Sequence, residues 1–218
     1  MSSLDATGAE ALHPAPTAVE RVADAVRAEI LSGELPADAP LREEAAAARY
    51  GVSRHTVRAA FQRLVAERLA VALPYRGVRV ASFDRDTIVA LQQLRAALEV
   101  EAVRIARQRY GSDWPDAALA PARDALERLG ASADWLEAER VHADFHRALV
   151  AASGSPRIVD AHTALGSELL LFLLHVRPHY TLESLVAEHR ELLDAVQSEG
   201  SSAIRAHLEH STRLLVGD

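Results

Sequence analysis

Two arginines one helical turn apart, Arg54 and Arg58, are the side chains best suited to bind nucleic acid. His55 and Thr56 lie beside them, near the start of a helix that the Ser53 hydroxyl would cap. In a helix-turn-helix, the N-terminal end of the second helix reaches base edges in the major groove. The alternative is an ordinary helix with a solvated basic face. The flanking sequence favours DNA binding, because it supplies the other parts of a DNA-binding unit.

Histidines form the second group with chemical potential, and eight of the ten lie after residue 83. His142 and His146 are four residues apart, so on a helix both rings would project from one face and could hold one metal ion. Alone, the pair is weak support for a metal, because such pairs more often decorate a surface or pack in a core.

The elements that must position the arginines precede residue 82. Apolar periodicity and turn residues predict, in chain order, a helix over 18–32, a short helix over 42–50, the basic helix after Ser53, and a hairpin of strands 71–73 and 78–80. Gly51 suits the turn before the basic helix, and Arg76 and Gly77 lie at the hairpin tip. Three helices followed by a hairpin predict a winged helix-turn-helix, with Arg76 placed to contact phosphate or the minor groove.

The rest of the chain has a helical pattern without strand alternation. Glycines and prolines divide it into expected helices over 84–110, 115–129, 134–153, 156–176, 182–199 and 201–216. The fold class is therefore mainly α, with an N-terminal winged helix-turn-helix and a C-terminal all-α bundle of six or seven helices that carries the histidines.

Charge is divided unevenly along the chain. The net charge is −7, but residues 49–79 hold seven arginines against one acid, Glu67, which gives that segment a charge of +6. Local charge governs attraction to phosphate, so the acidic total does not exclude DNA binding.

Composition excludes several classes of protein. The chain has 218 residues and no cysteine, which excludes disulfides and thiolate metal sites. Its longest apolar run, residues 169–174, is too short to span a membrane. We expect a cytoplasmic protein without a membrane partner, with a disordered tail over 1–17, a DNA-binding domain over 18–82 and an all-α effector-binding and dimerisation domain over 83–218.

Four short motifs appear in order in the first domain, at Ile30–Leu35, Leu41–Glu44, Tyr50–Arg58 and Arg76–Val80. In this respect the chain resembles the GntR family of bacterial transcription regulators, although Pro36-Ala37 stands where the family usually has Pro-Gly. The resemblance implies contacts with a double-stranded DNA operator. The residues expected to make them are Arg42, Arg54, His55, Thr56 and Arg58, with Arg76 and Gly77 on the wing.

Three motifs of the second domain, Leu94–Glu99, Phe145–Pro156 and Glu188–Val196, resemble the FCD effector domain found in one branch of that family. In that branch an Asp and three His commonly hold a divalent metal, and a small carboxylate effector can bind over it. The resemblance places His146 and His189 among the ligands, with His142 at the position of the Asp. Zinc or nickel suits such a histidine set.

The last ligand has two candidates, because the family spacing after His189 falls on Ser211, which is not a histidine. A deletion of one residue near Gly200 would place His210 there, and a loop shorter by one turn would place His207 there. Sequence reasoning prefers His210 and keeps His207 as the alternative.

Arg95 has two interpretations. In this family the arginine of the first helix often points into the cavity, where it would suit a carboxylate effector through a bidentate contact. The alternative is an ion pair with Glu99 along one helix face.

Together these features predict a regulator, most often a repressor in this family, and not an enzyme. A homodimer would present two recognition helices to two half-sites, and effector binding would change operator affinity. Two alternatives remain: the same regulator with a metal-free effector pocket, and a histidine-based metalloenzyme.

Overall fold

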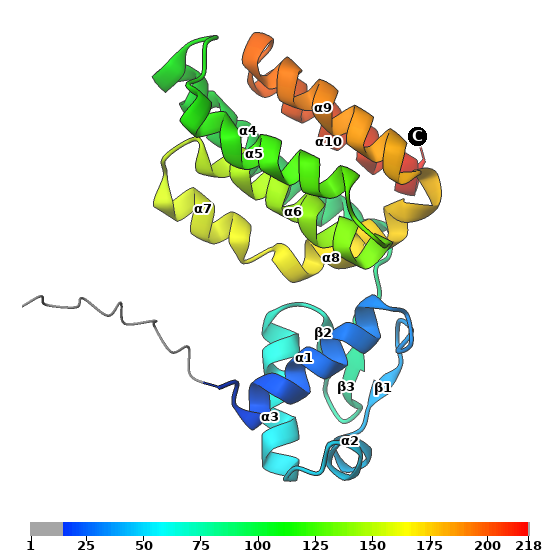
Figure 1. Cartoon of the computed structure of the whole chain (residues 1–218). Helices are drawn as coiled ribbons and strands as arrows, with labels where there is room; N and C mark the ends of the chain where they lie inside the picture. The colour runs from blue at the N-terminus through cyan, green and yellow to red at the C-terminus, as the bar shows by residue number, and fades with distance from the viewer. Residues whose placement is uncertain (1–14, 218) are drawn as a thin grey trace, which may run out of the picture.

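The computed structural model describes residues 15–217, which form two domains joined by a short linker (Figure 1). The expected disordered tail lies outside the described residues as far as residue 14. Thr17 is described and caps the first helix: its hydroxyl accepts from the N–H of Glu20, whose carboxylate accepts from the N–H of Thr17. This capping box fixes the start of α1.

The N-terminal domain is a winged helix-turn-helix, as the sequence predicts. Its elements are α1 (Ala18–Leu31), β1 (Pro40–Leu41), α2 (Glu43–Tyr50), α3 (Arg54–Ala66), β2 (Ala70–Leu73) and β3 (Gly77–Val80). Gly51 ends α2 with φ +64°, a left-handed conformation that glycine adopts without steric cost. The Ser53 hydroxyl then accepts from the N–H of Thr56 at 3.1 Å and begins α3.

The three strands form one antiparallel sheet in the order β1-β3-β2. The hairpin pairs Ala70 with Val80, and β1 adds Pro40 opposite Arg79. Sequence reasoning missed β1 because it is two residues long and its proline is typical of a loop. A proline is tolerated there because β1 is an edge strand that need not donate to a second neighbour.

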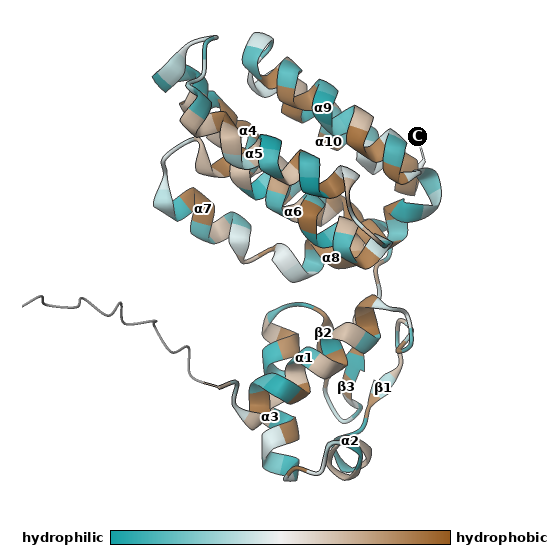
Figure 2. Cartoon of the chain, viewed as in Figure 1, coloured by the Kyte–Doolittle hydropathy of each residue, from teal (hydrophilic) through white to brown (hydrophobic). Residues whose placement is uncertain are grey.

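The C-terminal domain is all-α in the described residues, as expected. Its elements are α4 (Arg85–Tyr110), α5 (Asp116–Gly130), α6 (Trp135–Ala151), α7 (Pro156–Thr163), α8 (Gly166–Val176), the 3-10 turn η1 (Arg177–His179), α9 (Leu182–Ser198) and α10 (Ser201–Val216). Hydrophobic and hydrophilic residues interchange along these helices (Figure 2), which is the pattern of helices that bury one side.

One expected helix is wrong, because residues 156–176 form two helices and not one. The N–H of Leu165 bonds to the carbonyl of His162 and closes a tight turn, after which Gly166 begins α8. The bend between the two segments is 54°. It leaves α8 on the side of the bundle that faces the winged domain (Figure 1).

The two domains share apolar packing. The core of the winged domain contains Val57, Phe61 and Leu64 of α3, and it also includes Leu171 from α8. A separate core fills the helical bundle around residues such as Phe145. The domain interface is thus continuous with the core of the winged domain.

No single helix within residues 15–217 is long and apolar enough to cross a membrane. The bent pair Pro156–Thr163 and Gly166–His179 passes the same criterion only when its two parts are taken together.

Candidate functional site

The basic face of α3 is exposed. Arg54, His55 and Arg58 are solvent-accessible, while Val57 and Phe61 on the opposite face are buried. The same helix therefore packs through its apolar side and leaves its cationic N-terminal half open, as the sequence predicts.

The two arginines of α3 are held by acids of α2. Arg58 donates from Nε and Nη2 to the two oxygens of Glu43 at 2.8 and 2.7 Å, and Arg54 pairs with Glu44. The hydrogen bonds between Arg58 and Glu43 lower the pKa of the carboxyl group and raise the pKa of the guanidinium. Such exposed pairs add little stability, so phosphate oxygens can replace the carboxylates. Arg42, also exposed, precedes α2 as its N-cap residue.

The wing ends in Tyr75, Arg76 and Gly77, all exposed. Gly77 has φ +75°, and Tyr75 has φ +62°, which is uncommon for a residue with a side chain. The Tyr75 ring is fully exposed and was missed by sequence reasoning, although an aromatic residue beside the wing arginine was the available signal.

Inside the bundle, His142, His146 and His189 come together. Each offers a ring nitrogen within 4.8 Å of the others, and all three residues are buried. The two from α6 lie one turn apart, as predicted, and α9 supplies the third. Their ring nitrogens are close enough together to hold one metal ion.

Hydrogen bonds orient two of these rings. Nδ1 of His189 contacts the carbonyl oxygen of Leu185, and Nδ1 of His146 contacts Oε2 of Glu99, each at 2.8 Å. Both partners are acceptors, so both Nδ1 atoms carry the proton and both Nε2 atoms present lone pairs. These two Nε2 atoms face each other at 3.3 Å. Two lone pairs cannot hydrogen-bond to one another, so this arrangement suits a cation placed between the two nitrogens.

The rings are held in the form that binds metals. Burial lowers the pKa of His146 to about 4. Burial, aided by the neighbouring rings, also holds the pKa values of His142 and His189 well below their ordinary range. Neutral imidazole is the ligand form, so no proton has to leave at neutral pH.

Of the two candidates for the fourth histidine, His207 lies nearer the cluster than His210 does. The His207 ring lies 4.8 Å from that of His189 and 5.3 Å from that of His146, measured between centroids, and its Nδ1 lies 2.9 Å from Oε1 of Glu188. His210 is exposed instead. His210 lies three positions further along α10, on the edge of the same helix face, and the way α10 packs leaves it in solvent. Ser211, at the family position, is buried and accepts from Nε2 of Gln92 at 2.8 Å.

Arg95 is buried, and its position is compatible with both of its interpretations. Nε donates to Glu99 at 2.8 Å and Nη1 to Gln92 at 2.9 Å, so the expected pair along the helix is present. The same side chain also lines the cavity beside His142, so a contact with a carboxylate stays a prediction.

Glu99 is the centre of this polar network, and sequence reasoning recognised only its bond to Arg95. It also bonds His146 and, at 3.1 Å, Nε2 of His162, which is buried on α7. Burial alone would raise the pKa of Glu99, but Arg95 and His146 hold it well below its ordinary value. The three partners come from α4, α6 and α7, and sequence spacing gives no signal that they meet.

Little free space surrounds the cluster. The cavity beside Arg95, His142 and His189 has a volume of about 10 Å³, because Phe172 and Leu173 of α8 fill it. That is about the room needed for one water molecule.

An exposed basic recognition helix and wing, joined to an all-α domain with a buried ligand-type cluster, define a DNA-binding transcription regulator. The profile of the bacterial regulatory proteins of the gntR family matches residues 18–80, and that of the FCD domain matches residues 90–213. The chain therefore belongs to the GntR family, in the group that carries an FCD effector-binding domain.

Similar proteins agree with this assignment. A probable D-xylose utilization operon transcriptional repressor of Paenarthrobacter nicotinovorans is 28% identical over 194 residues, which are 89% of this chain and 85% of that protein. The HTH-type transcriptional repressor GlaR of Escherichia coli (strain K12) is 34% identical over 140 residues, covering 63% and 64%. A GntR crystal structure from Rhodococcus sp. RHA1 superposes with a TM-score of 0.74 at 26% identity, covering 91% and 97%. These relatives are transcription regulators and not enzymes.

Proposed function

We propose that this regulator is a cytoplasmic repressor that binds a two-fold symmetric operator as a homodimer. Arg42, Arg54, His55, Thr56 and Arg58 contact one half-site. Arg76 and Gly77 contact the flanking backbone or minor groove. Support comes from the exposure of the four arginines and His55 and from the excess of six positive charges over residues 49–79. The two relatives described above are named as repressors.

The second part of the proposal is that His142, His146 and His189 hold a divalent metal, zinc or nickel, with His207 as the fourth candidate ligand. One observation carries it: two Nε2 lone pairs face each other at 3.3 Å. Two ligand nitrogens at about 2.0–2.1 Å from a tetrahedral zinc lie roughly 3.3 Å apart. In addition, Nδ1 of His142 is buried without a hydrogen-bond partner in the described residues.

The third part is that the effector is a small carboxylate that binds beside Arg95. The buried Arg95 and Glu99 charges cancel, and the three histidines are neutral, so the cluster by itself has no net charge to attract an anion. A bound divalent metal would add two positive charges in a low-dielectric interior. The chain's own contribution is to hold the imidazoles in the correct tautomer and to place a guanidinium at the cavity.

Metal analysis tests the site directly. We expect about one zinc or nickel ion per chain in protein purified without chelator, measured by elemental analysis, and a clear loss of affinity in His146→Ala and His207→Ala by calorimetry. His210→Ala is the matched control and leaves affinity unchanged. Metal-free native protein that gains no stability from added zinc or nickel would instead support a metal-free pocket.

DNA binding is tested by selection from genomic fragments with the full chain, followed by gel-shift titration at several salt concentrations. One preferred fragment bound by a dimer is expected. The absence of any preferred fragment under every salt and metal condition contradicts the operator-binding part.

A further inference from the structure

Helix α8 has two apolar faces that serve different domains. Leu169, Phe172, Leu173 and Val176 recur at helical spacing and pack beside the histidine cluster. Leu171, between them in sequence, points the other way into the core of the winged domain. A displacement of α8 by a ligand would therefore alter the packing both beside the histidine cluster and in the core of the winged domain.

Polar contacts tie α8 to the end of the recognition helix. Glu67 is the C-cap residue of α3, and its Oε2 accepts from the Ser167 hydroxyl at 3.2 Å. The next residue, Arg68, has its Nε 3.5 Å from Oε1 of Glu168. Two consecutive residues of α8 thus hold the two residues that follow α3.

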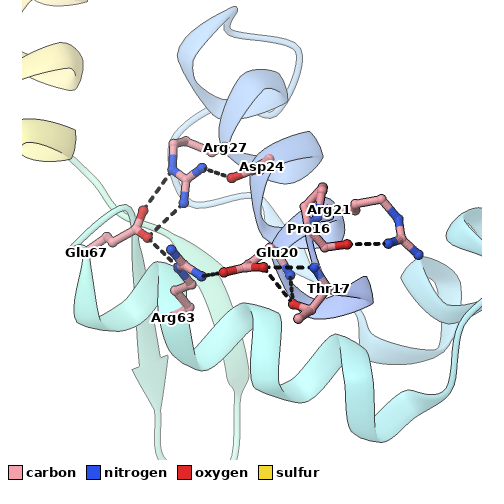
Figure 3. A network of polar contacts seen from close by, with 8 residues as sticks. All are labelled: Pro16, Thr17, Glu20, Arg21, Asp24, Arg27, Arg63 and Glu67. Carbon is pink, nitrogen blue, oxygen red and sulfur yellow. Dashed lines mark hydrogen bonds and ion pairs between the residues drawn. The ribbon is translucent and has the colours of Figure 1, made fainter. Parts of the chain in front are cut away.

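Glu67 is itself firmly held within the winged domain (Figure 3). Arg27 of α1 donates to both of its oxygens at 2.8 Å, and Arg63 donates from α3 at 3.3 Å. Because the same carboxylate also accepts from Ser167, a shift of α8 is passed to a rigid network that includes the recognition helix.

The cluster cavity offers almost no room, at about 10 Å³, whereas even a small carboxylate needs several times that volume. An effector beside Arg95 must therefore displace Phe172 or Leu173. Packed interiors respond to such insertions by discrete shifts of whole elements, because they are not continuously compressible.

We propose that α8 couples the effector cavity to the recognition helix, and that Ser167 and Glu168 are positioning residues for α3. This inference rests on the ligand site proposed above. The alternative route is the linker, where the Phe83 ring lies 6.5 Å from that of Phe172 and 5.2 Å from that of His175, between centroids.

Hydrogen exchange of the full chain with and without zinc tests the coupling, because it needs no known effector. In the wild type we expect zinc to protect peptides at the histidines of α6 and α9, and to change exchange over residues 64–70 by about twofold or more. In the double variant Ser167→Ala, Glu168→Gln, protection at the histidines stays and the response over 64–70 is lost. The double variant Ser198→Ala, Glu101→Gln removes a surface serine bond and an exposed ion pair elsewhere, and it responds as the wild type does.

An equal response over 64–70 with and without the two α8 contacts assigns the coupling to the linker and overturns the proposal. Protection confined to the histidines in the wild type overturns it as well. If zinc protects nothing, the metal site itself is wrong, and a second variant then decides the coupling separately.

That variant is Leu173→Phe, which adds volume on the cavity face and replaces neither a metal ligand nor Phe83. We expect it to accelerate exchange over 64–70 without any ligand, and only when Ser167 and Glu168 are intact. Acceleration that is independent of these two residues contradicts the proposal.

Discussion

The two domains use charged side chains in opposite ways. On the winged domain, the Arg54 side chain is 64% exposed and its partner Glu44 80% exposed, and a second such pair lies beside them. In the helical domain, Arg95 and Glu99 are both 2% exposed, and Glu99 also pairs with the buried His146 and His162. Exposed pairs exchange partners at little cost, whereas a buried network must stay complete. The exposed ion pairs of the winged domain can therefore be replaced by other contacts, whereas the buried network of the helical domain cannot lose a member without a large cost.

The exposed ion pairs of the winged domain also bear on operator binding. Glu43 and Glu44 occupy the guanidinium groups that the proposed operator contacts need. In the proposed complex these carboxylates would compete with phosphate oxygens for the two arginines.

The largest expected effect comes from opening the buried network. Glu99→Gln leaves the buried Arg95 without its counter-charge and disturbs the bonds to His146 and His162, so we expect a loss of roughly 3–5 kcal/mol in unfolding free energy. Denaturant titration followed by circular dichroism measures it.

The matched control is Glu101→Gln, two residues away on α4, which breaks only the exposed pair with Arg104. A change of less than about 0.5 kcal/mol is expected there. Equal effects of the two substitutions would remove the distinction between buried and exposed charge.

Zinc is expected to have the next largest effect. At a free concentration a hundred times the dissociation constant, binding stabilises the native state by about 2.7 kcal/mol. For a chain of this size that raises Tm by roughly 5–10 °C, and a chelator reverses it. His146→Ala abolishes the shift, and a shift that survives this substitution would place the metal elsewhere.

Operator affinity tests the role of the exposed arginines of α3. Arg58→Ala is expected to weaken it by roughly 1–3 kcal/mol in gel-shift titration, with a loss of sequence preference if the side chain reads bases. Arg123→Ala removes an exposed arginine of α5 and serves as the control.

Glu43→Gln tests whether the carboxylate competes with DNA, because it removes the charged partner of Arg58 and leaves Arg58 in place. We expect equal or slightly tighter operator binding. Clearly weaker binding would show that the carboxylate positions Arg58 more than it competes with DNA.

The smallest expected effect is a pH dependence from Glu139 on α6. Burial raises the pKa of this carboxyl group to about 7. Below the unfolded pKa of 4.5 the carboxyl group is protonated in both the folded and the unfolded chain, so native stability is at its full value. As pH rises from 4.5 to about 7, the unfolded chain loses this proton while the folded chain keeps it, so native stability falls. Tm should therefore fall by a few degrees between pH 5 and pH 7 in the wild type, and by less in Glu139→Gln. Parallel falls in both proteins would assign the dependence to another group.

The sequence predicts the elements and the outward-facing residues better than the interior network. Periodicity is local, so the helices around Val57 and Phe61 and the exposed placement of Arg58 follow from residues within a few positions. The bonds of Glu99 to residues 47 and 63 positions away do not, because they depend on how three helices pack.

The helix break and the choice between two histidines depend on similar long-range packing. The break before Gly166 lies in a stretch whose apolar residues suit a helix on either side, so only the turn at Leu165 reveals it. His207 and His210 are equally good ligands by type, and the rotation of α10 against α9 decides between them. Sequence reasoning kept both, and the structure places His207 at the cluster.

Leu171 has a consequence for the modularity of this chain. A leucine from the C-terminal half completes the apolar interior of the N-terminal half. A fragment truncated after the wing would expose that interior to water and would be less soluble than the intact chain. A chimera that exchanged the DNA-binding half between relatives would have to preserve a suitable side chain at this distant position.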